Sequence, residues 1–182
     1  MKRVLTVAAA VAMTLISGVA TVSAANTTSG RTDLTLYVEN DPIYTVTVPE
    51  TVALSATENT LVPITASDVQ YIPEGKKISV TLERGNGTFG RLYLEGTNEE
   101  TGKEYMMTLY VKGTDGEFKM GALENQIKGM ELASFTEDGT MNYELRPAAL
   151  NYPDSTADNL TIQKGVHYSG YITYGIELTD IQ

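Results

Sequence analysis

The longest regular pattern in this chain is a two-residue alternation between residues 166 and 178. One set of alternating positions is apolar or glycine: Tyr168, Gly170, Ile172, Tyr174, Ile176 and Leu178. The positions between them are mostly polar: Ser169, Tyr171, Thr173, Gly175 and Glu177. Because successive side chains of a strand point to opposite faces of its sheet, this pattern predicts a β-strand with an inward and an outward face.

Shorter segments of the same kind fill most of the chain from residue 33 onward, with Thr, Val, Ile and Tyr enriched in them. They are residues 33–39, 43–48, 61–66, 77–83, 91–95, 104–112, 130–135, 141–145 and 160–163. Clusters of Gly, Asn and Asp at residues 85–87, 114–116 and 137–139 predict tight turns between some of them. Residues 121–129 predict one short helical turn. Ten short strands at this spacing predict an all-β fold, an antiparallel β-sandwich of immunoglobulin-like type.

The first 25 residues have a different character. Lys2 and Arg3 precede an apolar stretch over residues 4–22, and small residues follow at positions 22–25. This order is typical of a secretory signal peptide, cut after Ala24 or Ala25. The alternative is an uncleaved anchor, because the stretch approaches the length that a bilayer requires. Its Ala, Ser, Thr and Gly content favours cleavage, so we expect residues 1–25 to be a signal peptide and the mature protein to be secreted, without a membrane span.

The mature chain of about 158 residues is long enough for one domain, which we place at residues 41–182. It contains no Cys, so a secreted fold of this kind depends on packing and strand pairing rather than on disulfides. Without Lys2 and Arg3, 11 basic residues stand against 23 acidic ones, a net charge of about −12. Such a surface repels nucleic acid, which we exclude as a partner.

Residues 26–40 form an N-terminal extension ahead of this domain. Its polar lead, residues 26–31, is followed by an alternating strand with Leu34, Leu36 and Val38 on one face. Pro42 interrupts the pattern before the next strand, because proline cannot donate to a strand ladder. A short amphipathic strand is thereby expected on a flexible lead.

The two ends of the chain resemble fimbrial subunits of the donor-strand kind, which include chaperone–usher pilins and spore coat U-like proteins. In that family the last strand often has the pattern Gly-x-x-Tyr-x-Gly/Asp-x-Ile/Val-x-Phe/Tyr, and residues 165–174 match it from Gly165 to Tyr174. The alternating strand at residues 33–39 matches the family's N-terminal extension. A second resemblance, carried by residues 44–49, is to surface β-sandwich proteins of Gram-positive gut bacteria. The chain lacks the usual pilin Cys pair, and without Trp it has no Trp-x-Leu wall-binding motif.

The resemblance implies an incomplete sandwich, completed by a strand that a neighbouring subunit donates. Leu34, Leu36 and Val38 would then be the donor anchors. The acceptor groove would be lined by the inward residues of the last strand: Tyr168, Gly170, Ile172, Tyr174 and Ile176. We also expect Gly170 to leave room for an anchor of the inserted strand. The implied partners are further copies or related subunits, with an assembly chaperone or a host surface ligand as additional candidates.

Two alternatives remain open at this point. Residues 33–39 would pair within their own sandwich if the protein were a self-complete adhesin or a module that binds cell wall or glycan. An exported enzyme is not expected, because His167 is the only His and there is neither a Cys nucleophile nor a Gly-x-Ser-x-Gly elbow. We therefore predict no catalytic residues and no cofactor. Asp115, Glu117, Glu137 and Asp138 could gather as calcium ligands, but no calcium-loop pattern is present and no metal site is assigned.

Overall fold

The computed structural model describes residues 4–6, 40–152 and 154–181. Its strands are β1 (Val4–Thr6), β2 (Ile43–Thr47), β3 (Thr60–Gln70), β4 (Lys76–Gly85), β5 (Tyr93–Thr97), β6 (Glu104–Lys112), β7 (Phe118–Met120), β8 (Glu131–Phe135), β9 (Gly139–Pro147) and β10 (Ile172–Asp180). Short helical turns are η1 (Thr88–Gly90), α1 (Glu124–Ile127), η2 (Ala148–Leu150) and η3 (Asp158–Leu160). The predicted donor strand with Leu34, Leu36 and Val38 lies outside the described residues.

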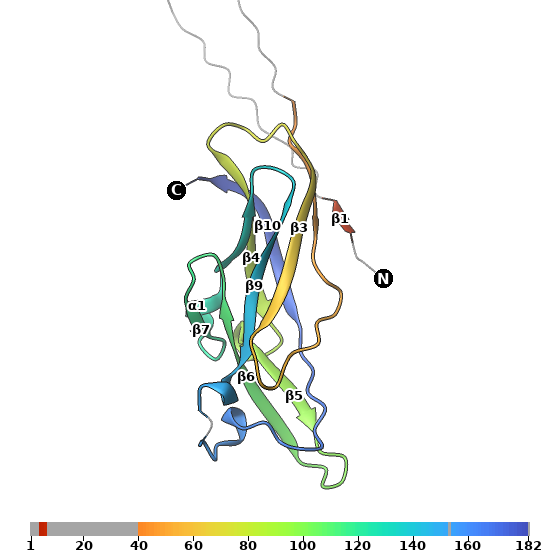
Figure 1. Ribbon diagram of the computed structural model, residues 1–182, viewed down its shortest axis with the longest axis vertical. Helices are drawn as coiled ribbons and strands as arrows, with labels where there is room; N and C mark the ends of the chain where they lie inside the picture. Colours follow the sequence, from red (N-terminus) through yellow and green to blue (C-terminus); the bar gives the residue numbers. More distant parts are fainter. Residues whose placement is uncertain (1–3, 7–39, 153, 182) are drawn as a thin grey trace, which may run out of the picture.

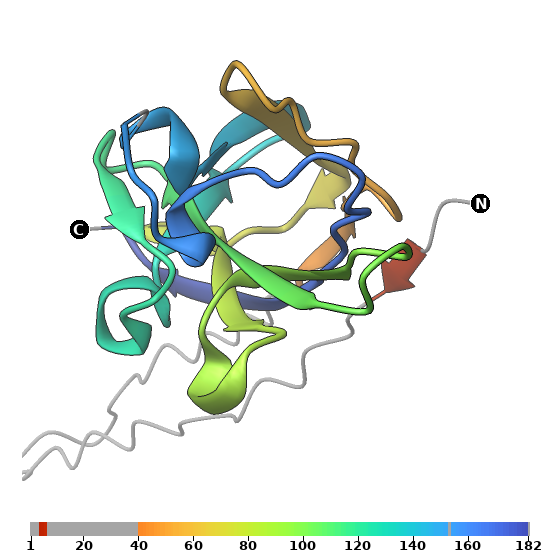
Figure 2. The ribbon, with the colours of Figure 1, turned by 90° about the horizontal axis from the view of Figure 1, so that it is seen from below.

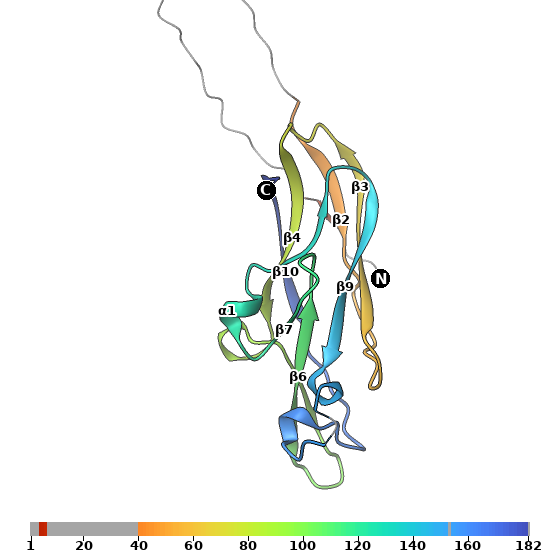
Figure 3. The same ribbon diagram turned by 60° about the vertical axis from the view of Figure 1, so that its left-hand side comes forward.

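The strands form two antiparallel sheets that face each other (Figures 1 and 3). The larger sheet has the order β1-β2-β3-β9-β6-β5, with β7 also paired to β6, and the smaller has the order β10-β4-β8. Two of the connections by which the chain crosses between the layers, β3–β4 and β8–β9, lie at the upper end in Figure 1. The predicted all-β antiparallel sandwich is confirmed.

Side chains from the inner faces of both sheets fill the space between the layers. On β3, buried Val62, Ile64 and Ala66 alternate with exposed or half-exposed neighbours, as expected for a strand with one covered face. Opposite them, β4 buries Ile78, Val80 and Leu82 completely. Each such side chain contributes about 1.5–3 kcal/mol when it leaves water. Seen along the long axis, the strands surround this common interior (Figure 2).

Most strand predictions are confirmed, several with shifted ends. The strand at residues 104–112 is correct at both ends, and α1 lies inside the predicted helical turn. The strand predicted at 160–163 is wrong. η3 ends at Leu160, and side-chain hydrogen bonds hold the residues that follow it. Thr161 Oγ1 donates to the Ser155 carbonyl at 2.9 Å, and Gln163 N–H donates to the Tyr168 hydroxyl at 3.2 Å. β7, only three residues long, was not predicted.

The last predicted strand, residues 166–178, is only partly regular. Ladder pairing with β4 begins at Ile172 and continues to Asp180. Before Ile172 the chain leaves this sheet and approaches β5, where Ser169 pairs with Glu95 and Val166 with Asn98 in single antiparallel bridges. The reason is that β4 ends at Gly85, the partner of Ile172, so no further β4 backbone is present to extend the ladder.

Candidate functional site

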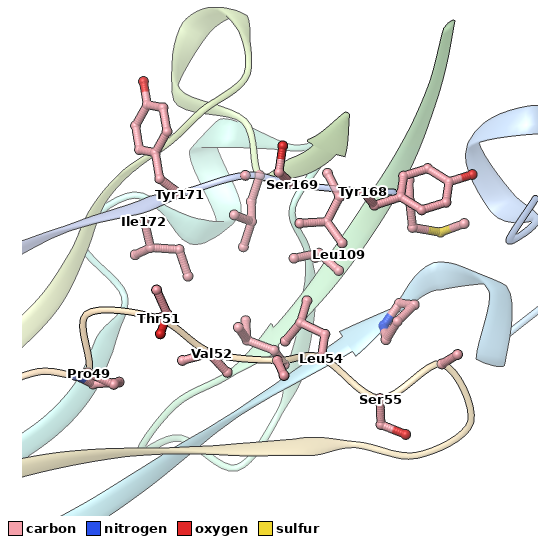
Figure 4. A pocket seen from close by; sticks show the side chains of 18 of the residues that line it. Pro49, Thr51, Val52, Leu54, Ser55, Leu109, Tyr168, Ser169, Tyr171 and Ile172 are labelled. Carbon is pink, nitrogen blue, oxygen red and sulfur yellow. The ribbon is translucent and has the colours of Figure 1, made fainter. Parts of the chain in front are cut away.

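An open groove of about 630 Å³ runs along one side of the sandwich. One wall is the segment that follows β2, residues 49–56, and the other is the segment that leads into β10, residues 166–172. Figure 4 shows the two walls facing each other, with Val52 and Leu54 on one side and Ile172 on the other. The groove lies at the boundary between the two sheets, because the first wall continues from the larger sheet and the second enters the smaller one.

The floor of this groove is apolar. It consists of inward-facing side chains of β5, β6 and β9 and of the residue that precedes β5: Leu92, Leu94, Met107, Leu109, Tyr143 and Leu145. Five of these six side chains are buried in the core, and Leu94 is half-buried beside them. The groove therefore opens directly onto the hydrophobic core of the domain, a surface that water solvates poorly.

The first wall is loosely held. β2 pairs with β3 only as far as Thr47, opposite Thr65, and the chain then separates from the sheet. Among the described residues, the backbone between Thr51 and Ala56 makes no hydrogen bond to another backbone group. This segment is joined to β3 by a hydrogen bond that Ser55 N–H donates to Thr60 Oγ1 at 2.9 Å. Sequence analysis missed this wall, although the short alternation of Val52 and Leu54 with polar or small residues was a signal for it.

The second wall continues into an unpaired strand edge. β10 pairs with β4 on one side, and no strand of the described chain pairs with its other side. Its inward side chains Ile172, Tyr174, Ile176 and Leu178 pack against the core but stay only partly buried. Their partners Leu82, Val80 and Ile78 on β4 are fully buried. The inner face of β10 is therefore covered incompletely, as expected for a strand that has a neighbour on only one side among the residues described.

The strand order can be compared with that of an immunoglobulin-like sandwich. In an immunoglobulin-like sandwich, strands A, B, E and D form one sheet and strands C, F and G the other. The run β2-β3-β9-β6 corresponds to A-B-E-D, and β4 and β10 correspond to C and F. The free side of β10 is therefore where strand G would lie.

Four of the five predicted acceptor residues line the groove: Tyr168, Gly170, Ile172 and Tyr174. Ile176 does not line it, and packs against the core further along β10. Ile172 points into the groove in Figure 4, whereas Ser169 and Tyr171 point away from it, as the alternation predicts. The side chain of His167 is exposed.

The role predicted for Gly170 needs correction. A Cβ atom at this position would lie 2.6 Å from the Tyr93 carbonyl oxygen and 3.1 Å from Asn86 Oδ1. Glycine therefore allows the chain to pass close to the start of β5, and the space it leaves is occupied by backbone of the same molecule. The prediction that Gly170 makes room for a facing anchor was wrong, because the sequence did not reveal that residues 166–169 turn toward β5.

Two tyrosines connect the sheets across the groove floor. The hydroxyl oxygens of Tyr143 on β9 and Tyr174 on β10 are 2.7 Å apart, and their rings meet edge to face with centroids 6.3 Å apart. Burial raises the pKa of both phenols above the ordinary value of tyrosine, so both stay neutral. The pair satisfies two polar atoms inside an apolar region, and it fixes the inner face of β10 against the larger sheet.

The predicted acidic groups lie on separate turns. Asp115 pairs with Lys119 near β7, whereas Asp138, before β9, accepts a hydrogen bond from Val69 N–H at 2.8 Å. Within residues 4–6, 40–152 and 154–181, no three His, Cys, Asp or Glu side chains are grouped as metal ligands would be. No helix in the same ranges is both long and apolar enough to span a bilayer.

The groove thus offers an apolar floor and a row of backbone donors and acceptors on β10 that no described strand pairs with. This combination suits recognition of an extended chain, because the strand edge binds main chain and the floor accepts alternate side chains. Comparisons of this chain with protein-family models, with curated proteins and with solved structures found no match.

Proposed function

We propose that this protein is a secreted bacterial surface subunit of fimbrial type, which polymerises when the N-terminal strand of one copy, residues 33–39, inserts into the groove of the next. The observation that carries the proposal is the edge of β10, unpaired within the described part of the chain, beside an apolar groove. An inserted strand would take the place of strand G and pair with β10. It would also cover the half-buried side chains of β10, which an isolated domain leaves in contact with water.

The energetics make insertion favourable. Leu34, Leu36 and Val38 would each contribute about 1.5–3 kcal/mol on full burial. Each ladder hydrogen bond along β10 adds about 0.5–1.5 kcal/mol. The edge is also a hazard while it is empty, because unpaired strands recruit other chains unselectively. Insertion of a matched strand from a neighbouring subunit removes that hazard.

The course of the chain favours donation to a neighbour. β2 begins at Ile43 opposite Gln70, at the end of the sandwich where β3 turns into β4. A strand that folded straight back at Pro42 would lie along β2 in the larger sheet. It would leave the edge of β10, in the smaller sheet, uncovered.

The second candidate is a self-complete monomeric module that binds cell wall, glycan or a host protein. One observation favours it: β1 pairs antiparallel with β2, with Leu5 opposite Val46. Because β1 lies in the predicted signal peptide, the outer edge of β2 would be free after cleavage. Residues 33–39 could then occupy that edge as a hairpin within the same molecule.

The test is polymer formation by the mature protein, beginning at residue 26 and examined by size-exclusion chromatography and electron microscopy. Fibres are expected from the unchanged sequence. Leu36→Asp should abolish them, because an unpaired charge in an apolar groove is costly. The matched control is Leu123→Asp, at a leucine that is 44% exposed and does not line the groove. Fibres that form equally well with Leu36→Asp would refute strand donation, and a soluble monomer of the unchanged chain would favour the second candidate.

A further inference from the structure

A second cluster of side chains lies on the opposite face of the larger sheet from the groove. Its members come from adjacent strands, with Tyr110 of β6 paired with Arg146 of β9 and, on its other side, with Met120 of β7. Phe118 of β7 is the pair of Lys112 in the next row. Because Leu109 and Leu145 face the groove, the alternation directs Tyr110 and Arg146 outward.

Arg146 is an unusual cation in this surface. Its guanidinium carbon lies 3.9 Å from the centroid of the Phe118 ring and 5.9 Å from that of Tyr110. Nε is buried and has no hydrogen-bond partner in the part of the chain that the structure describes. Among the described residues, no carboxylate forms an ion pair with this guanidinium. A guanidinium stacked on a ring keeps its in-plane N–H groups free for a ligand.

A carboxylate near Arg146, that of Glu144, is already engaged. Glu144 accepts hydrogen bonds from Lys112 Nζ at 2.6 Å and from Asn59 Nδ2 at 2.8 Å. The bond from Lys112 is the main reason that the pKa of Glu144 is lowered, and the positive charge of Arg146 adds to this effect. Lys112 and Glu144 compensate each other, so Arg146 is the remaining charge of the cluster.

Two phenol groups complete the cluster. The hydroxyl oxygens of Tyr110 and Tyr152 are 3.2 Å apart, and burial is the main cause of the raised pKa of Tyr110. Tyr152, which follows η2, is 41% exposed, so part of this side chain is accessible to a ligand. Aromatic surface beside a few polar groups that fix orientation is the usual composition of a small-ligand site.

We propose that the Arg146 cluster (Tyr110, Phe118, Arg146 and Tyr152) binds an acidic sugar, with the sugar carboxylate on the Arg146 guanidinium and the sugar ring against Tyr152. A carboxylate matches the planar donors of arginine in a two-point contact. The hydroxyl pair of Tyr110 and Tyr152 suits a ligand that is rich in hydroxyl groups. Since the cluster and the groove lie on opposite faces of the sheet, the site would remain accessible whether or not the protein polymerises by the proposed route.

Equilibrium dialysis of labelled trigalacturonate against the mature protein tests this site. Saturable binding of one ligand per chain is expected, at least tenfold weaker for the methyl ester, which lacks the charge. Arg146→Gln should weaken binding of the acid at least tenfold, and Arg146→Lys should weaken it less. The matched control is Arg91→Gln, at an exposed arginine before β5, which should leave binding unchanged.

Three results would overturn the proposal. They are the absence of saturable binding, equal binding by Arg146→Gln, and inorganic phosphate competing as effectively as the sugar acid on a molar basis. If Arg146→Gln does not fold, Tyr152→Ala replaces it, because that exposed side chain can be removed with little effect on the fold. Unchanged sugar affinity in a folded Tyr152→Ala protein would equally refute the site. None of these results depends on fibre formation, so the polymer and the sugar site can fail separately.

Discussion

The two edge strands of the smaller sheet, β8 and β10, differ in how their outer sides are covered. At the β8 edge, which we call the closed edge, the turn after β6 covers the start of the strand, since Thr114 N–H donates to the Glu131 carbonyl at 3.0 Å. Leu132 and Ala133 behind it are fully buried. At the β10 edge no strand of the described chain is paired, and the inward side chains are only partly buried. This fold therefore covers the start of one edge with its own turn and buries the side chains behind it, so the β10 edge stands out as the place for an added segment.

The β8 edge also carries a polar network, whereas the described residues show a single ion pair at β10, between Asp180 at its end and Lys76 of β4. The Glu131 carboxylate accepts hydrogen bonds from Lys77 Nζ, Ser79 Oγ and Thr114 Oγ1, at 2.8 to 3.1 Å. These contacts join β4, β8 and the turn between β6 and β7. Along β10, the corresponding interactions would have to come from an inserted strand.

The largest expected effect is a contrast between two leucine substitutions. Leu132→Ala at the closed edge should lower the free energy of unfolding by about 2–5 kcal/mol, because it leaves a cavity in a filled core. Leu54→Ala, in the half-buried wall of the groove, should cost the isolated domain less than about 1 kcal/mol. Chemical denaturation of both variants measures the difference. An equal loss at both positions would mean that the groove wall is as well packed as the closed edge.

A smaller effect is expected at the tyrosine pair. Tyr143→Phe removes one hydroxyl and leaves the Tyr174 hydroxyl without its partner in a buried place, which should cost about 1–3 kcal/mol. The matched control is Tyr71→Phe, at an exposed tyrosine in the β3–β4 turn, which should be near neutral. If thermal unfolding of the two variants is the same, the pair does not hold β10 against the larger sheet.

The smallest expected effect is on the pH dependence of stability. Burial opposes ionisation of Glu131, but the hydrogen bonds from Lys77, Ser79 and Thr114 outweigh it and lower the pKa of this carboxyl. A lowered folded-state pKa gives stability that is complete above the unfolded value and is lost as pH falls through the folded value. Between pH 7 and pH 3, the free energy of unfolding of Glu131→Gln should therefore fall by about 1 kcal/mol less than that of the unchanged protein. An unchanged profile would show that the network does not stabilise the closed edge.

Sequence patterns predicted the elements whose structure is determined by the local sequence. β6 was predicted to the residue, because its run of Tyr, Met, Leu and Val residues is bounded by charged residues at both ends. The alternation of β10 also gave the correct inward face, with Ile172, Tyr174 and Ile176 on it. The failures are residues 160–163 and 166–171, where the outcome depended on which backbone lay nearby rather than on local composition.

The site was predicted only in part for the same reason. One wall followed from the alternation of the last strand, but the wall at residues 49–56 and the Tyr143–Tyr174 bond depend on three-dimensional neighbours. Gly170 shows the difficulty most clearly. A glycine on an inward face was interpreted as space for a ligand, although the approach of Tyr93 from the same chain explains it.

The central claim is that residues 33–39 of one molecule occupy the groove of another, and paired cysteines test it directly. The chain has no natural Cys, so Leu36→Cys together with Leu54→Cys introduces the only two thiols. Under mild oxidation we predict a ladder of covalent multimers on a non-reducing gel, and a covalent dimer when the two single-cysteine proteins are mixed. A disulfide confined to the monomer, or thiols that remain free in both experiments, would contradict strand donation between subunits.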